Sequence, residues 1–216
     1  RSPCSFVLPA HRVELTLPQW ITYQIKKRGK MFSRNREDFP TLQGDHPPAY
    51  LDSACVTLKP QSVIDAIHRY YTETPGCGGR SVHRFGTAVS KSVSEARTKV
   101  GSFLNAPNQN EIVFTRNATH SINQVAHGMT WSKGDIVLTT DREHNSNLVP
   151  WLQLEQEQGI DHRVVPSQHD NTFDMEAFET ACADAGNQLK LVAMSHVGNL
   201  DGVAIPIGEI TKVAHD

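Results

Sequence analysis

The chain has 216 residues, of which 38% are hydrophobic and 20% are charged, and its formal net charge is −2. These proportions are those of an ordinary globular protein that can bury a substantial core, and they exclude a collagen-like, low-complexity or membrane-spanning chain. The nearly balanced charge gives no indication of a nucleic-acid partner.

The charge is unevenly distributed along the chain. Residues 1–36 contain eight basic residues and one acidic residue, which leaves 13 basic and 22 acidic residues in 37–216. We therefore expect a basic leader over 1–36, disordered or non-native, and a folded domain over 37–216. An Arg-rich, acid-poor leader is also compatible with an organellar transit peptide, whereas its apolar runs are too short for a secretion signal.

The four cysteines are Cys4, Cys55, Cys77 and Cys182, and no two of them form a CxxC pair. Neither they nor the histidines follow a metal-ligand spacing, so we predict no metal site. Without a secretion signal, the cysteines are expected to be reduced thiols of a cytoplasmic protein.

The first half of the folded region predicts two helices. After a short strand at 49–52, Pro60 suits the first turn of a helix over 61–74, and the glycine-rich segment 75–79 breaks it. A long amphipathic helix follows. Its apolar residues recur at helical spacing on one face: Val89, Val93, Ala96, Val100, Phe103 and Leu104.

From residue 111 onward, strand-like and helix-like segments alternate. The predicted strands are 111–115, 136–140, 162–165 and 189–195, and the predicted helices are 119–127, 147–158, 175–185 and a segment from near 207. Apolar strands between helices predict an α/β fold with a mostly parallel sheet flanked by helices. Because a βα series normally returns to the sheet after each helix, we expect these residues to form an incomplete large domain.

Two segments at predicted strand ends could bind an anionic, flat ligand. The helix start at Ala118 and Thr119 offers N–H groups and a hydroxyl to a phosphate, although Asn117 or Thr119 could equally serve as an N-cap without a ligand. His144 follows the strand 136–140 and could stack on a heteroaromatic ring, or could be a structural histidine.

Two further residues are candidates for substrate contacts. Asn199 follows the strand 189–195, where its amide could bind a phenol oxygen or a carboxylate, or could form an Asx turn. Arg84 ends a glycine-hinged loop and could recognise a carboxylate or phosphate from a partner subunit, or lie on a surface turn. Cys55 and Cys77 lack a local base and are not expected to be nucleophiles.

Taken together, these segments resemble the class V aminotransferase family, and within it the SufS-like cysteine desulfurases. The resemblance rests on the order and spacing of Tyr50-Leu-Asp-Ser-Ala54, Val82-His-Arg84, Phe114-Thr-Arg-Asn-Ala-Thr119, Glu143-His144, Asn147-Leu-Val-Pro-Trp151 and Ser195-His-Val-Gly-Asn199. It covers about residues 49–216.

The resemblance implies a PLP-dependent transferase type I fold and a pyridoxal 5′-phosphate (PLP) cofactor. Ala118 and Thr119 would bind its phosphate, and His144 would stack on the ring as a catalytic residue. Asn199 would lie near the cofactor hydroxyl or the substrate carboxylate, and Arg84 would approach the partner's site in a homodimer. The implied reaction takes sulfur from cysteine, giving alanine and an enzyme persulfide, with a sulfur-acceptor protein of iron–sulfur assembly as partner.

The sequence also departs from the family pattern. Asn145 stands where relatives often carry a second histidine, and Ala118 and His120 replace a hydroxyl and an acid. The family's cofactor lysine and persulfide cysteine are expected beyond the equivalent of residue 216, and Lys133, Lys190 and Lys212 do not match that lysine's position. The alternatives are another class V PLP enzyme, such as a selenocysteine lyase, epimerase or transaminase, and a catalytically incompetent split or degenerate half domain.

Overall fold

The structure is a computed structural model of the chain, and it describes residues 36–216. The chain divides into two compact units, Arg1–Lys91 and Ser92–Asp216, and each is described here by itself. Almost all of the predicted leader lies outside the described residues, so the proposed transit peptide and the domain boundary after residue 36 stay predictions.

The described part of the first unit is mostly helical. It contains the 3-10 helix η1 (Pro40–Leu42), the helix α2 (Gln61–Glu73) and the beginning of α3 (Arg84–Phe103). Pro60, which was expected in the first turn of α2, is its N-cap residue. The predicted strand at 49–52 is wrong, because the described chain offers it no strand partner and Leu51 is 94% exposed.

The glycine-rich loop before α3 packs closely on the first turn of that helix. A Cβ on Gly86 would lie 2.5 Å from the Cβ of Ser81 and 2.7 Å from its carbonyl oxygen, so only glycine fits at this position. The loop is also fastened by a 2.8 Å hydrogen bond from the Gly79 N–H to Ser90 Oγ. Arg84, expected at the end of the loop, is instead the first residue of α3.

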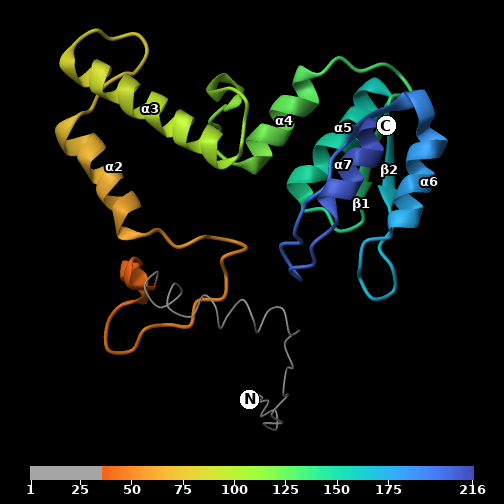
Figure 1. Ribbon diagram of the computed structural model, residues 1–216, viewed down its shortest axis with the longest axis horizontal. Coiled ribbons are helices and arrows are strands. Elements are labelled where there is room, and N and C mark those ends of the chain that lie inside the picture. Colours follow the sequence, from red (N-terminus) through yellow and green to blue (C-terminus); the bar gives the residue numbers. More distant parts are fainter. Residues whose placement is uncertain (1–35) are drawn as a thin grey trace, which may run out of the picture. The chain divides into compact units, whose positions relative to one another are not determined.

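The second unit is an α/β structure (Figure 1). After α3 its elements are η2 (Gln109–Glu111), α4 (Ala118–Gly128), β1 (Ile136–Thr140), η3 (Asn145–Asn147), α5 (Val149–Gln158), β2 (Asp161–Val165), α6 (Met175–Ala185), η4 (Gly186–Gln188), β3 (Leu189–Val192) and α7 (Ile207–His215).

The three strands form one parallel sheet in the order β2-β1-β3. Ile136 at the start of β1 is level with Asp161 of β2 and Leu189 of β3. All five residues of β1 are buried, as expected for a central strand covered on both faces. The predicted α/β fold with a parallel sheet is therefore confirmed, and β2 and β3 are the edge strands of the described sheet.

The predicted strand over 111–115 is wrong. None of the three described strands pairs with this segment, and without a partner its apolar side chains stay in solvent, with Val113 69% and Phe114 49% exposed. The segment is held by α3 instead, because Arg97 Nε donates to the Ile112 carbonyl oxygen at 3.1 Å. The apolar pattern alone could not reveal the missing partner.

Alternate residues of β1 point to two separate cores. Ile136 and Leu138 pack against α6 and α7, whereas Val137 packs on the opposite face, against α4 and α5. The first core is completed by Val165, Phe178, Ala185 and Ile210, and the second by Ala126, Trp151, Leu154 and Ile160. Helices therefore cover both faces of the sheet, as the alternation of strands and helices predicts.

Two element boundaries differ from the predicted ones near the ends of β1 and β3. The helix expected over 147–158 is split into η3 and α5, with Pro150 in the first turn of α5. The strand expected over 189–195 stops at Val192. Both changes lie at the same edge of the sheet.

Candidate functional site

The carboxyl ends of β1 and β3 form a crevice. After β1 the chain turns to α5 on one face of the sheet, and after β3 it turns to α7 on the opposite face. In open α/β sheets, ligands bind where two neighbouring strands are followed by connections to opposite faces. The crevice between β1 and β3 is therefore the candidate site.

Glu143 lies between the segment that follows β1 and the segment that follows β3. Its carboxylate accepts hydrogen bonds from Thr140 Oγ1 (2.8 Å), from Asn147 Nδ2 (2.8 Å), and from Ser195 through both the backbone N–H (3.0 Å) and Oγ (2.7 Å). Ser195 is 52 residues away in sequence. The turn after β1 is thus joined to the segment after β3 by one carboxylate.

Asn147 connects the same network to the core. It is 8% exposed, and its Nδ2 also donates to the Ala193 carbonyl oxygen at 2.9 Å, while its Oδ1 accepts from Trp151 Nε1 at 3.2 Å. Trp151 is 1% exposed. Because every polar atom of the Asn147 amide is bonded, its orientation is fixed by the core.

His144 is exposed and caps η3. Its Nδ1 accepts a hydrogen bond from the Ser146 backbone N–H at 3.1 Å and lies 2.9 Å from Ser146 Oγ. Since a backbone N–H can only donate, Nδ1 of the neutral ring carries no proton, and the hydrogen is on Nε2. The ring therefore turns an N–H donor away from its own turn.

The start of α4 keeps two N–H groups available. Asn117 is the N-cap, and its side chain accepts from the His120 N–H at 2.9 Å. The amides of Ala118 and Thr119 have no acceptor among the described residues. The N-cap and the anion site, which the sequence offers as alternatives, are therefore compatible, because the cap uses the third amide of the helix and leaves the first two.

A pocket of about 430 Å³ lies beside this helix start. It is lined by Ala118, Ser121, Ile122 and Val125 of α4, by Ser146, Asn147 and Trp151, and by residues 191–195. The predicted residue Ala118 therefore lines the pocket, whereas Thr119 lies next to it on the helix, and His144 reaches it only through its contact with Ser146.

Asn199 lies in a neighbouring hollow of about 350 Å³, lined by Asp141, Arg142, Glu143 and residues 198–201. It is exposed, at the tip of a turn closed by the Gly198 N–H, which donates to the Val203 carbonyl oxygen at 2.8 Å. An ion pair of 2.7 Å between Arg142 and Asp201 joins the turn to the segment after β1.

Arg84 belongs to the first unit and is described within it alone. Its guanidinium lies 5.1 Å from the centre of the Phe85 ring, within range of a cation–π contact. Its expected role toward a partner subunit stays a prediction.

Glu143, Asn147 and Ser195 carry the site geometry, and sequence reasoning assigned them no role. All three belong to the motifs that resemble the family, but Ser195 lies 52 residues from Glu143 in the chain. A usable signal was the spacing of Glu143 and Asn147, four residues apart beyond a buried strand, which brings both side chains to one side of the turn.

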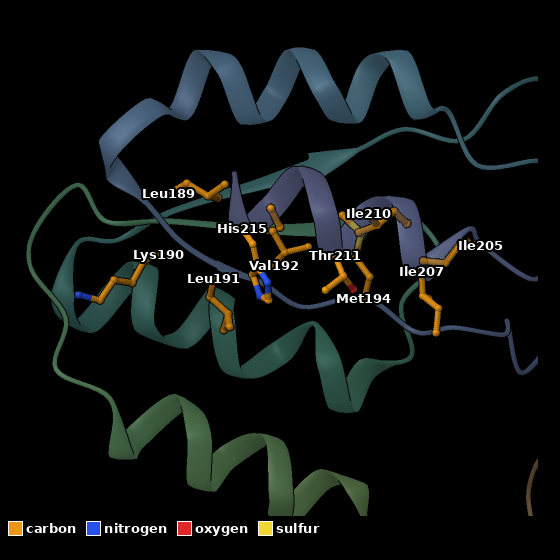
Figure 2. A pocket seen from close by; sticks show the side chains of 11 residues that line it. Leu189, Lys190, Leu191, Val192, Met194, Ile205, Ile207, Ile210, Thr211 and His215 are labelled. Carbon is orange, nitrogen blue, oxygen red and sulfur yellow. The ribbon is translucent and has the colours of Figure 1, made fainter. Parts of the chain in front are cut away.

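A further pocket of about 310 Å³ lies between β3 and α7, and its lining side chains are drawn in Figure 2. Its walls are mostly apolar, among them Leu189, Val192, Ile207 and Ile210. It contains none of the predicted site residues, so the candidate site remains the crevice between β1 and β3.

Three of the four cysteines, Cys55, Cys77 and Cys182, lie in the described part of the chain. Cys55 and Cys77 are exposed, and burial, with a smaller effect of Glu179, raises the pKa of the Cys182 thiol above 9.0. In residues 36–216, no cluster of three or more His, Cys, Asp or Glu side chains could hold a metal ion. No helix in that range is long and apolar enough to span a membrane.

The chain is similar in sequence to a known family and to known proteins. The model of the aminotransferase class-V family matches residues 49–216. A probable cysteine desulfurase of Synechocystis is 37% identical over 186 residues, and a cysteine desulfurase of Enterobacter is 37% identical over 188 residues. These alignments cover 83% of this chain but 44% and 45% of those proteins, so the chain spans less than half the length of the curated relatives it matches.

Solved structures of similar fold include cysteine desulfurases. The apo enzyme of Thermococcus onnurineus has a TM-score of 0.74 and 30% identity, and Escherichia coli CsdA has a TM-score of 0.71 and 30% identity. Each match covers 85% of this chain and less than half of the other. With its parallel sheet, its crevice at the ends of β1 and β3 and its family match over 49–216, this chain belongs to the class-V aminotransferase family, as its motifs predict.

Proposed function

We propose that this chain forms part of a PLP-dependent cysteine desulfurase and binds PLP at the carboxyl ends of β1 and β3. The observation that carries the proposal is the pair of available N–H groups at Ala118 and Thr119 beside the pocket of about 430 Å³. The similarity to proteins named cysteine desulfurase supports this choice within the family.

The residues at the start of α4 fit a phosphate. Two backbone N–H groups, the Thr119 hydroxyl and the positive end of the helix dipole favour an anion at this position. Thr115 Oγ1 lies 2.7 Å from Ser121 Oγ, which braces the turn that leads into the helix. The side chain of Ala118 is only a methyl group, so it takes little of the space beside the helix start.

His144 would cover one face of the pyridine ring. In the tautomer fixed by Ser146, Nε2 carries the hydrogen and can donate it toward cofactor or substrate, while Nδ1 is held by the protein. The ring can therefore hold a proton at Nε2 without losing its own support. This arrangement supports roles for His144 in stacking and in proton transfer.

Cysteine is the substrate that the relatives support. When bound, PLP supplies an electron sink for the substrate carbanion. The Asn199 amide would hold the cofactor hydroxyl or the substrate carboxylate. In the overall reaction, the C–S bond of cysteine breaks and its sulfur passes to a protein thiol, so that cysteine and a thiol give alanine and a persulfide.

The proposal extends to the partners of the complete enzyme. We infer a cytoplasmic homodimer in which Arg84 approaches the partner's site, and a sulfur-acceptor protein of iron–sulfur assembly. An arginine at the start of a helix, next to a glycine-rich loop, suits recognition of a carboxylate or phosphate across a subunit interface. The dimer can be tested by replacing Arg84 with cysteine and adding a thiol crosslinker. A covalently linked dimer is expected, and a product that contains only crosslinks within single chains would contradict the proposed dimer.

The test of the site uses pyridoxine 5′-phosphate, which cannot bond covalently to a lysine. Calorimetry on the 216-residue chain should give saturable binding, at least about tenfold tighter than binding of pyridoxine, because a phosphate at a helix start makes several charge-assisted hydrogen bonds. Equal affinities for the two compounds would contradict the phosphate site.

The test of the reaction uses the polypeptide isolated from its natural source, supplied with PLP, a thiol reductant and one amino acid at a time. Release of alanine and sulfide from cysteine is expected. Turnover of selenocysteine alone, epimerisation, or amino transfer would assign the chain to one of the alternative class V activities.

A further inference from the structure

We propose that Glu143 is a positioning residue that acts together with Asn147. The side chains of these two residues continue the hydrogen bonding between β1 and β3 beyond the ends of the strands. They thereby set the position of His144 relative to Asn199. The last backbone hydrogen bond between the two strands runs from the Ala193 N–H to the Leu138 carbonyl oxygen at 2.9 Å. Beyond it the strands separate.

Beyond this point, the side chains of Asn147 and Glu143 make the hydrogen bonds that a neighbouring strand would otherwise make. Asn147 Nδ2 donates to the Ala193 carbonyl oxygen at 2.9 Å, and Glu143 accepts from the Ser195 N–H at 3.0 Å. In a parallel ladder, one residue of the neighbouring strand donates to the carbonyl oxygen of residue i−1 and accepts from the N–H of residue i+1. Asn147 and Glu143 reproduce this pattern around Met194, with side chains in place of a backbone.

The carboxylate of Glu143 is compensated by hydrogen-bond donors. In the part of the chain that the structure describes, no cation pairs with its carboxylate, which instead receives four donors from Thr140, Asn147 and Ser195. Hydrogen bonds to a charged acceptor are about twice as strong as neutral ones. A half-buried carboxylate with these partners resists separation of the two segments.

The junction lies between the two candidate cofactor residues. His144 directly follows Glu143, and Asn199 lies four residues after Ser195 on a turn that Arg142 joins through Asp201 at 2.7 Å. Adjacent residues 142 and 143 thus fasten both ends of the segment 195–201. This inference rests on the proposed function only for the identity of the ligand. The hydrogen bonds of Glu143 and Asn147 to the segment 193–195 are formed without any ligand.

The experiment compares the parent chain with Glu143→Gln and Glu143→Ala by residue-resolved amide hydrogen exchange without ligand. Exchange at Ser195 should accelerate by about 10- to 100-fold in Glu143→Ala and by less in Glu143→Gln, which keeps one acceptor oxygen. The Ala193 amide, which bonds to Leu138, serves as the internal reference and should stay protected. The matched control is Glu157→Gln, because Glu157 accepts one bond from Gln153 on the surface of α5.

The proposal would be overturned if exchange at Ser195 were unchanged in Glu143→Gln. It would also be overturned if exchange accelerated equally at Ser195 and Ala193, because that result would show a general destabilisation of the fold. Should Glu143→Ala not fold, Glu143→Gln decides alone. Calorimetry with pyridoxine 5′-phosphate is the second arm, where Glu143→Gln should weaken binding several-fold and Glu157→Gln should not. No binding to the parent would refute the proposed function, while the exchange result would still decide the role of Glu143.

Discussion

Thr139 and His162 meet on neighbouring strands, with 2.9 Å between Thr139 Oγ1 and His162 Nε2. Thr139 is fully buried on β1, and His162 is half-buried on β2. The contact places a titratable ring against the central strand of the sheet.

Protonation of His162 should destabilise the second unit. Burial lowers the pKa of His162 below 6.5, against the smaller opposing effects of Glu155 and Asp161. Because the folded pKa is the lower one, this contribution to stability is complete above about pH 6.5 and is lost as the pH falls below it. Urea unfolding followed by tryptophan fluorescence should show a falling midpoint between about pH 7.5 and pH 5. The decline should be smaller in His162→Gln, and unaltered in the control His169→Gln.

Asp141 should add a second dependence at lower pH. Burial acts to raise the pKa of Asp141, but the Ser167 hydroxyl and N–H, at 2.6 and 3.0 Å, outweigh it and with Arg142 lower the pKa below 3.8. The resulting stability is present above the unfolded value and is lost as the pH falls through the folded one. In Asp141→Asn, the loss of stability measured between about pH 5 and pH 3 should be smaller than in the parent chain. The control variant Asp184→Asn, which changes an exposed aspartate, should lose as much stability as the parent chain.

The N-cap of α4 should matter for both stability and phosphate binding. Asn117→Ala removes the acceptor of the His120 N–H and should lower the free energy of unfolding by about 1 kcal/mol. Asp174→Ala removes the equivalent cap of α6 and should cost a similar amount. Only Asn117→Ala should weaken binding of pyridoxine 5′-phosphate. Equal binding by the two variants would argue against a phosphate at α4.

Loss of the His144 ring should weaken binding of the cofactor. An aromatic stacking contact is worth about 0.5–1.5 kcal/mol, so His144→Ala should reduce PLP affinity about 2- to 13-fold and change its visible spectrum. His127→Ala, on the exposed end of α4, is the control. An affinity and spectrum unchanged from the parent would contradict the stacking role.

The sequence predicted the elements that its own patterns determine. The strand 136–140 and the helix 175–185 have the predicted bounds, since a buried apolar strand and a helix with an aspartate N-cap are local signals. The strand over 111–115 was predicted from an equally apolar run, but a strand also requires a hydrogen-bonding partner, and a single sequence does not show which segment provides one.

The candidate site was predictable only in part for the same reason. Ala118, Thr119 and His144 were proposed because each lies at a helix start or near a strand end, which are local features, and their roles stay predictions. The bond between Glu143 and Ser195 spans 52 residues and depends on β1 and β3 being neighbours. Sheet order is a property of packing, so this contact could not be derived from the spacing of either segment.

The pocket between β3 and α7 also bears on how the polypeptide behaves in concentrated solution. β3 is an edge strand of the described sheet, so its outer backbone N–H and C=O groups can pair with an extended peptide, whose side chains could contact the apolar side chains of the pocket. Among the described residues that line this pocket, Lys190 is the one lysine or arginine, and its ammonium lies 4.0 Å from Asp135. The positive charge of Lys190 therefore lies beside this edge strand, where charged side chains disfavour edge-to-edge pairing of sheets.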